Sequence, residues 1–287
     1  MKTRFLFLGL CCALAAISCT SIDDSASATK PLTITLSKDD STTKTTFATD
    51  GTGLTRVWKE GDAVSVLYIV SETKYYNEKF VLSAGAGTTK GTFMCASSHI
   101  PTTGTANVQI LYPYTEDSSV YDYCLTRSIA NQGNGSLDNL GNYDWMYAKG
   151  TFTDGVFSAT STLESEVSFL KIPKGTKLYN DGDDATTINL TLSEANNYLS
   201  TSIHNSKISY DWSTISGGSV TLTGIALSEK KTVSDIYIAI SCMSGRNDYS
   251  FKFTVKKDDT TLSEITIKRN TSIERAHVYT IPSTKFF

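Results

Sequence analysis

One cysteine near the start of the chain stands where a thiol is commonly modified with lipid. Cys19 follows a serine at the end of an apolar run, Phe5–Ile17, which comes after the basic residues Lys2 and Arg4. A charged start, a short apolar middle and a small-residue exit are typical of a secretory signal, and this run is too short to span a bilayer permanently. A small residue directly before cysteine matches a bacterial lipobox, so residues 1–18 are predicted to be a signal peptide. Acyl chains on Cys19 would anchor the chain durably; an ordinary cleaved signal with a chance cysteine is the alternative.

Other residue types that carry chemistry form no recognisable site. The chain has three histidines, none in a metal-ligand spacing such as H-E-x-x-H: His99, His204 and His277. It has no G-x-S-x-G elbow and no glycine-rich phosphate loop before a helix. Asp181, Asp183 and Asp184 could offer oxygen ligands to calcium, but they lack the spacing of a known calcium loop, so a solvated turn is favoured. We expect no catalytic residue, no cofactor and no metal.

Cysteines and tryptophans favour structural roles. Cys95 and Cys242 continue two-residue apolar alternations and are interpreted as core residues, while a Cys95–Cys124 disulfide is left open. The tryptophans could stack on sugars, although burial explains most tryptophans. They are Trp58, Trp145 and Trp212.

Most of the chain alternates apolar and polar residues with period two, which predicts strands that bury one face. The clearest runs are Leu32–Leu36, Val64–Val70, Val108–Tyr112, Ile188–Leu192, Ile236–Ile240 and Phe251–Val255. Turn signals separate them at short intervals, and no helical period persists. We therefore predict an all-β, antiparallel fold with few helices: a flexible tether over 19–30, then two β-sandwich domains over 31–160 and 161–287. The net charge of −3 with no basic block indicates no nucleic-acid partner.

The strongest internal motif is Thr55–Val66, with Arg56, Trp58 and Gly61-Asp62 at its centre. We expect Trp58 to be buried, because its segment leads through the Gly61-Asp62 turn into the strand of Val64 and Val66. The motif resembles the T-R-x-x-W-x-x-G-D-x-I-x-V block of fimbrillin-like proteins, the Mfa-like pilin family of Gram-negative anaerobes. Further blocks follow in the family's order, although the family's usual histidine near the fifth is missing here. They are Phe80, Gly91–Phe93, Leu111–Tyr114, Asp144–Ala148, Val167–Ile172 and Arg275–Ile281.

This resemblance implies two transthyretin-like sandwiches and a shaft, tip or anchor subunit of a type V pilus, or a regulator of its assembly. In the family, an arginine-specific protease removes the first strand, and a terminal strand of the next subunit fills the groove that is left. Leu32, Ile34 and Leu36 would form the removable strand. The C-terminal donor residues would be Val278, Ile281, Phe286 and Phe287. The implied partners are other pilin subunits, the outer membrane through the lipid, and a host or bacterial surface ligand. The acidic pair Asp23-Asp24 resembles an export signal for surface lipoproteins.

The expected protease site is the main departure from the family. Between Cys19 and Arg56 the chain has no arginine, only Lys30, Lys38 and Lys44. Cleavage at Arg56, cleavage at a lysine, and a subunit that keeps its first strand and ends a fibre at the membrane all remain open. A surface glycan-binding lipoprotein of a polysaccharide-uptake system, with exposed aromatic platforms, is the second hypothesis. A secreted glycosidase is a weaker third.

Overall fold

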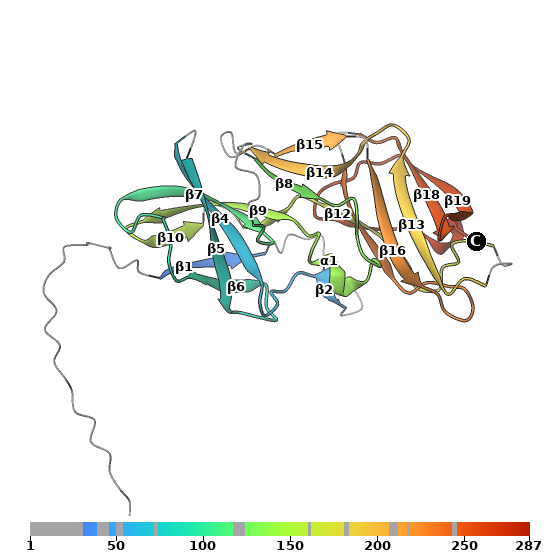
Figure 1. Ribbon diagram of the computed structural model, residues 1–287, viewed down its shortest axis with the longest axis horizontal. Coiled ribbons are helices and arrows are strands. Elements are labelled where there is room, and N and C mark those ends of the chain that lie inside the picture. Colours follow the sequence, from blue (N-terminus) through green and yellow to red (C-terminus); the bar gives the residue numbers. More distant parts are fainter. Residues whose placement is uncertain are drawn as a thin grey trace, which may run out of the picture.

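The fold is nearly all β, as the alternating pattern predicts (Figure 1). The computed structural model describes residues 31–38, 46–49, 54–71, 74–116, 124–159, 162–180, 184–206, 212–216, 218–242 and 246–287. Within these ranges the helices are α1 (Leu137–Leu140) and η1 (Ser283–Lys285). Neither has the length or apolarity that a membrane span requires.

The first half of the chain builds one eight-stranded antiparallel sheet, with strand order β1-β6-β5-β4-β7-β9-β10 and β11 paired to β9. The strands are β1 (Leu32–Ser37), β4 (Ala63–Ser71), β5 (Lys74–Ala84), β6 (Lys90–Cys95), β7 (Thr105–Tyr112), β9 (Met146–Thr153), β10 (Val156–Ala159) and β11 (Glu164–Ser165). Beside this sheet, β2 (Thr46–Thr49) pairs with β3 (Leu54–Thr55).

This sheet curls so that its two edge strands, β1 and β10, come to lie next to each other. The curl encloses a core to which inward-facing residues of nearly every strand contribute, because successive side chains of a strand alternate between its faces. Its largest fully buried members are Trp58, Phe80, Phe93, Phe152, Ile34 and Leu36.

The second half forms two sheets that pack face to face around a second core. The six-stranded sheet has the order β15-β14-β17-β12-β20, with β8 paired to β14, and the four-stranded sheet has the order β16-β13-β18-β19. The strands are β8 (Cys124–Ser128), β12 (Ser168–Ile172), β13 (Thr187–Glu194), β14 (Leu199–Ser206), β15 (Trp212–Ser216), β16 (Ser219–Ala226), β17 (Ile236–Cys242), β18 (Tyr249–Lys257), β19 (Thr260–Arg269) and β20 (Val278–Thr280). Among the strand pairs of the described residues, one departs from the predicted antiparallel arrangement: β20 runs parallel to β12. Some isolated bridges, such as that between Lys38 and Leu163, are parallel as well.

The two cores do not divide the sequence at one point. Strand β8 joins a sheet of the second half, and the segment that follows it supplies Ile129, Leu140 and Trp145 to the second core. The chain then returns through β9 and β10 to the first sheet, which ends with β11. The predicted domain boundary at 160/161 falls between β10 and β11, at residues outside the described ranges, and it stays a prediction.

Candidate functional site

Strand β1 fills one edge of the first sheet with its apolar face turned inward. It pairs with β6 over six residues, from Leu32 opposite Cys95 to Ser37 opposite Lys90. Leu32, Ile34 and Leu36 are only 3%, 1% and 2% exposed and belong to the first core. The intervening Thr33 and Thr35 are exposed, so the strand separates cleanly into a core face and a solvent face.

Among the described strands, β1 forms a backbone ladder only with β6. Its other side lies next to β10. Beyond β10, Leu163 forms an isolated parallel bridge with Lys38 at the end of β1, and Leu163 N–H donates to the Ser37 carbonyl at 3.1 Å. Lys38 N–H donates to the Thr89 carbonyl at 3.0 Å. Strand β1 is therefore held by its backbone pairing with β6, by three buried side chains, and by the backbone hydrogen bonds of Ser37 and Lys38 at its C-terminal end.

Lys38, which the sequence offers only as a candidate cleavage residue, is buried and has a role that the sequence does not predict. It continues the two-residue spacing of the buried face and is itself 3% exposed. Its ammonium lies 4.0 Å from the ring centroid of Trp58 and 4.4 Å from that of Tyr112, and it donates to the Val57 carbonyl at 3.3 Å. Burial lowers the pKa of Lys38 from 10.5 to about 8, against the opposing pull of the Asp144 and Asp62 carboxylates. Its position after Leu36 at an inward-facing step was the available signal.

Arg56, the candidate protease site, is buried in the same region. It is 4% exposed, and its Nε donates to Asp144 Oδ2 at 2.7 Å, while Ser165 Oγ donates to Asp144 Oδ1 at 2.8 Å. Asp144 itself is fully buried. In the folded chain, therefore, neither Arg56 nor Lys38 is presented to a protease; Cys19, Lys30 and Lys44 lie outside the described residues.

Trp58 is fully buried, which confirms the expectation from its motif. Its ring makes edge contacts with Phe93 and Tyr112, at centroid distances of 4.6 and 5.2 Å. The Gly91 step of the family pattern has a packing reason, since a Cβ there would lie 2.7 Å from Trp58 Cδ1. The Trp58 ring therefore packs directly against the backbone of Gly91, where no side chain would fit.

The C-terminal candidate donor segment is docked on its own half of the molecule. Strand β20 is an edge strand beside β12; Val278 packs against the second core and Ile281 is 7% exposed. Phe286 meets Phe253 edge to face at 5.6 Å, whereas Phe287 is 49% exposed. To donate a strand, this segment would first have to leave these contacts.

A buried carboxylate ties that C-terminal segment to the residues between the two halves. Arg275 pairs with Glu166 at 2.6 Å, although Glu166 is only 7% exposed. Burial raises the pKa of Glu166 from 4.5 to about 6, with Arg275 acting in the opposite direction.

The sugar and metal hypotheses find little support among the described residues. Trp145 is 3% exposed and belongs to the second core, so it is no surface platform; the side chain of Trp212 lies outside the described part. No group of three potential metal ligands occurs in the part of the chain that the structure describes. Cys95 is a buried free thiol, not half of a disulfide.

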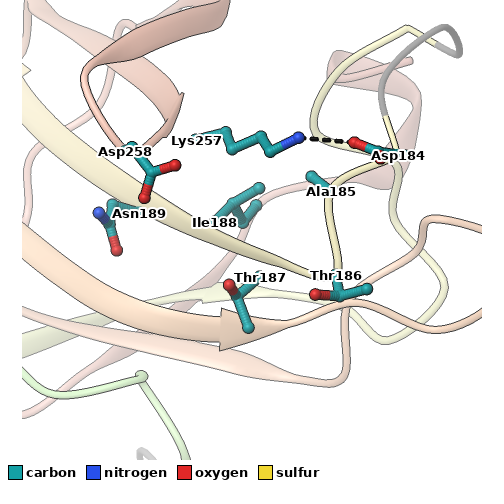
Figure 2. A pocket seen from close by; sticks show the side chains of 8 residues that line it. All are labelled: Asp184, Ala185, Thr186, Thr187, Ile188, Asn189, Lys257 and Asp258. Carbon is teal, nitrogen blue, oxygen red and sulfur yellow. Dashed lines mark hydrogen bonds and ion pairs between the residues drawn. The ribbon is translucent and has the colours of Figure 1, made fainter.

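One polar pocket lies at a loop end of the four-stranded sheet, and Figure 2 shows Lys257 reaching toward Asp184 across it. The two charges are 2.6 Å apart, but Asp184 is 94% exposed, so the pair contributes little. No aromatic face lines this pocket. Its lining residues are Asp184, Ala185, Thr186, Thr187, Ile188, Asn189, Lys257 and Asp258.

Comparisons with known proteins give distant structural likenesses. No family model matches the chain, and no curated protein matches it. A candidate cell adhesion protein from Bacteroides ovatus is similar with 15% identity and a TM-score of 0.44, over 78% of this chain and 81% of that one. One from Bacteroides thetaiotaomicron has 11% identity and a TM-score of 0.38, over 78% and 79%. The fimbrial anchor protein Mfa2 from Porphyromonas gingivalis has 10% identity and a TM-score of 0.38, over 84% and 82%. All three TM-scores lie below 0.5, so these likenesses are distant.

Proposed function

We propose that this protein is a structural or adhesive subunit of a type V pilus, exported as a lipoprotein and assembled by strand exchange. The observation that carries the proposal is β1, an edge strand whose inward side chains, Leu32, Ile34 and Leu36, are almost completely buried. A strand with one ladder and a deeply inserted apolar face leaves a groove when it departs. An extended segment of another subunit fits such a groove by adding its own backbone ladder and side chains.

The energetics support exchange rather than simple loss. Full burial of one such side chain contributes about 1.5–3 kcal/mol, so the three together contribute about 5–9 kcal/mol. That is comparable to the whole stability of an ordinary domain, about 5–15 kcal/mol. A subunit without β1 would therefore bind a replacement strand tightly, and its free sheet edge would otherwise be a site for aggregation.

The processing step would act on residues other than Arg56 and Lys38 in the folded chain, because both are buried. One route is cleavage between β1 and β2, where Lys44 lies. The other is a chain that keeps both lipid and β1, and so forms the membrane end of a fibre as an anchor. Before any cleavage, the proposed location is the outer membrane, through Cys19. A cut after β1 would release the subunit from that anchor into the fibre, whereas an uncut subunit would stay at the membrane. In both cases the two proposed β-sandwich domains would face outward, toward other subunits and a surface ligand.

A cut in the chain just after β1 tests the proposal. A specific protease sequence is placed within residues 39–45 of the full-length protein, and cut and uncut material are compared by native electrophoresis. We expect the cut protein to lose β1 and, once mixed with partner subunits that supply a replacement strand, to form a ladder of oligomers, as a fibre subunit would. An excess of synthetic peptide Leu32–Lys38 should suppress the ladder, whereas a peptide with serine at positions 32, 34 and 36 should not. A cut protein that sheds β1 and stays monomeric in the presence of partner subunits would contradict the strand-exchange role.

A further inference from the structure

The groove beneath β1 ends in a pocket built for a positive charge. We call it the cation pocket; its parts are the ring faces of Trp58 and Tyr112, the Val57 carbonyl and the carboxylates Asp62 and Asp144. In the folded chain the ammonium of Lys38 occupies it, within 4.0 and 4.4 Å of the two ring centroids. A ring face attracts a cation, and more strongly where water is excluded.

The buried and half-buried charges in this region balance only when the pocket is filled; Lys59, which also acts on Lys38, is exposed to solvent. Asp144 is paired with Arg56, and Asp62 accepts hydrogen bonds from Tyr112 Oη at 3.2 Å and from Lys59 N–H at 2.8 Å. Among the buried and half-buried groups, Lys38 and Arg56 therefore face Asp62 and Asp144. Removal of Lys38 leaves one cation against two carboxylates, and an uncompensated charge in a buried site is costly.

We infer that the strand that replaces β1 must carry a lysine or arginine two residues beyond its last buried apolar residue. This inference rests on the proposed strand exchange and specifies the partner: an extended segment of pattern apolar-x-apolar-x-apolar-x-cation. Leu32, Ile34, Leu36 and Lys38 are the internal copy of that pattern. The three apolar pockets supply most of the affinity, and the cation pocket fixes the register, since a slip of one residue would turn the charge toward solvent.

The chain's own C-terminal segment meets this requirement only in part. At the same spacing it offers Tyr279, Ile281, Ser283 and Lys285, so a polar residue stands at the third apolar step and Pro282 lies beside it. Strand β18 also carries the pattern, but it is paired on both sides, with β13 and β19. The fitting occupant is therefore a strand of a different protein rather than the C-terminal segment of a second copy.

Peptide competition on the full chain, cut within residues 39–45 as above, tests this. A fluorescent Leu32–Lys38 peptide is exchanged into the cut protein, and unlabelled competitors are compared by fluorescence anisotropy. We expect Lys38→Arg to compete nearly as well as the native peptide and Lys38→Met to compete at least about tenfold more weakly. A peptide of residues 278–287 should also be at least about tenfold weaker.

Equal competition by the Lys38→Met peptide would overturn the charge requirement, and equal competition by the 278–287 peptide would overturn the choice of a different protein. If no peptide enters, even the native one, the strand-exchange function fails. The charge requirement is then decided in the uncut chain: Lys38→Met should melt below Lys38→Arg. A Lys38→Met chain that melts at or above the native protein would refute it.

Discussion

Shortening one buried side chain of β1 should destabilise the first half of the molecule far more than changing its exposed neighbour. Ile34 is 1% exposed, lies in the middle of the strand opposite Phe93 and belongs to the first core. Ile34→Ala removes apolar contacts and leaves a cavity, and substitutions of this kind cost about 2–5 kcal/mol. Leu32 and Leu36, the buried residues on either side of Ile34 along β1, stay in place. The cavity therefore has little room to collapse, and we expect a cost in the upper half of that range.

The matched control is Thr35→Ala, one residue further along the same strand but on the solvent face. A surface change of this kind usually shifts stability by less than about 0.5 kcal/mol. Both variants are measured by urea denaturation, followed by far-ultraviolet circular dichroism and by tryptophan fluorescence, since Trp58 reports the same core. If Ile34→Ala and Thr35→Ala shift the midpoint equally, the side chain of Ile34 does not support the core, and the energetic basis of strand exchange is lost.

Four further predictions concern other residues. Cys19→Ala should release the protein from the membrane fraction and abolish palmitate labelling; retention of both would contradict lipidation at this site. Trp58→Ala should lower the free energy of unfolding by about 3–5 kcal/mol in urea, because the ring is fully buried. Asp144→Ala should lower the free energy of unfolding by about 3–5 kcal/mol, because it leaves Arg56 buried and unpaired. The double variant Asp144→Leu with Arg56→Met should recover most of that loss. A double variant as unstable as Asp144→Ala would contradict this explanation. Glu166 has its pKa raised from 4.5 to about 6, so the folded state holds the proton more tightly than the unfolded state. The protonated carboxyl therefore contributes up to about 2 kcal/mol to the free energy of unfolding. This contribution is fully present below about pH 4.5 and is lost as the pH rises through about 6. Melting temperatures across that range should show the loss, and Glu166→Gln should remove it.

The alternation of apolar and polar residues predicted the parts of the fold that depend on local sequence pattern. The spacing of Leu32, Ile34 and Leu36 predicted a strand with one buried face, and Trp58 was predicted to be buried; the structure confirms both. Such predictions succeed because a strand with period two has only one way to hide its apolar side chains.

Long-range pairing could not be predicted in the same way. Nothing local shows that β20 runs parallel to β12, or that the segment around Leu140 and Trp145 packs into the second core. The cation pocket shows the same limit: Lys38 looks like an ordinary charged residue after a strand, and its role depends on aromatic rings and carboxylates from distant positions. These features depend on which strands meet, which period-two patterns do not encode.

The pairing of Leu32 with Cys95 gives the molecule a built-in chemical indicator of whether β1 is in place. Cys95 is a free thiol with 6% exposure, it lies at the end of β6 opposite Leu32 at the start of β1, and burial raises its pKa. Leu32 of β1 belongs to the same core, and burial of the sulfur disfavours the reactive thiolate. Departure of β1 would uncover it, so the rate of alkylation at Cys95 would report the occupancy of the groove, in solution or on the surface of intact cells, without any added label on the strand itself.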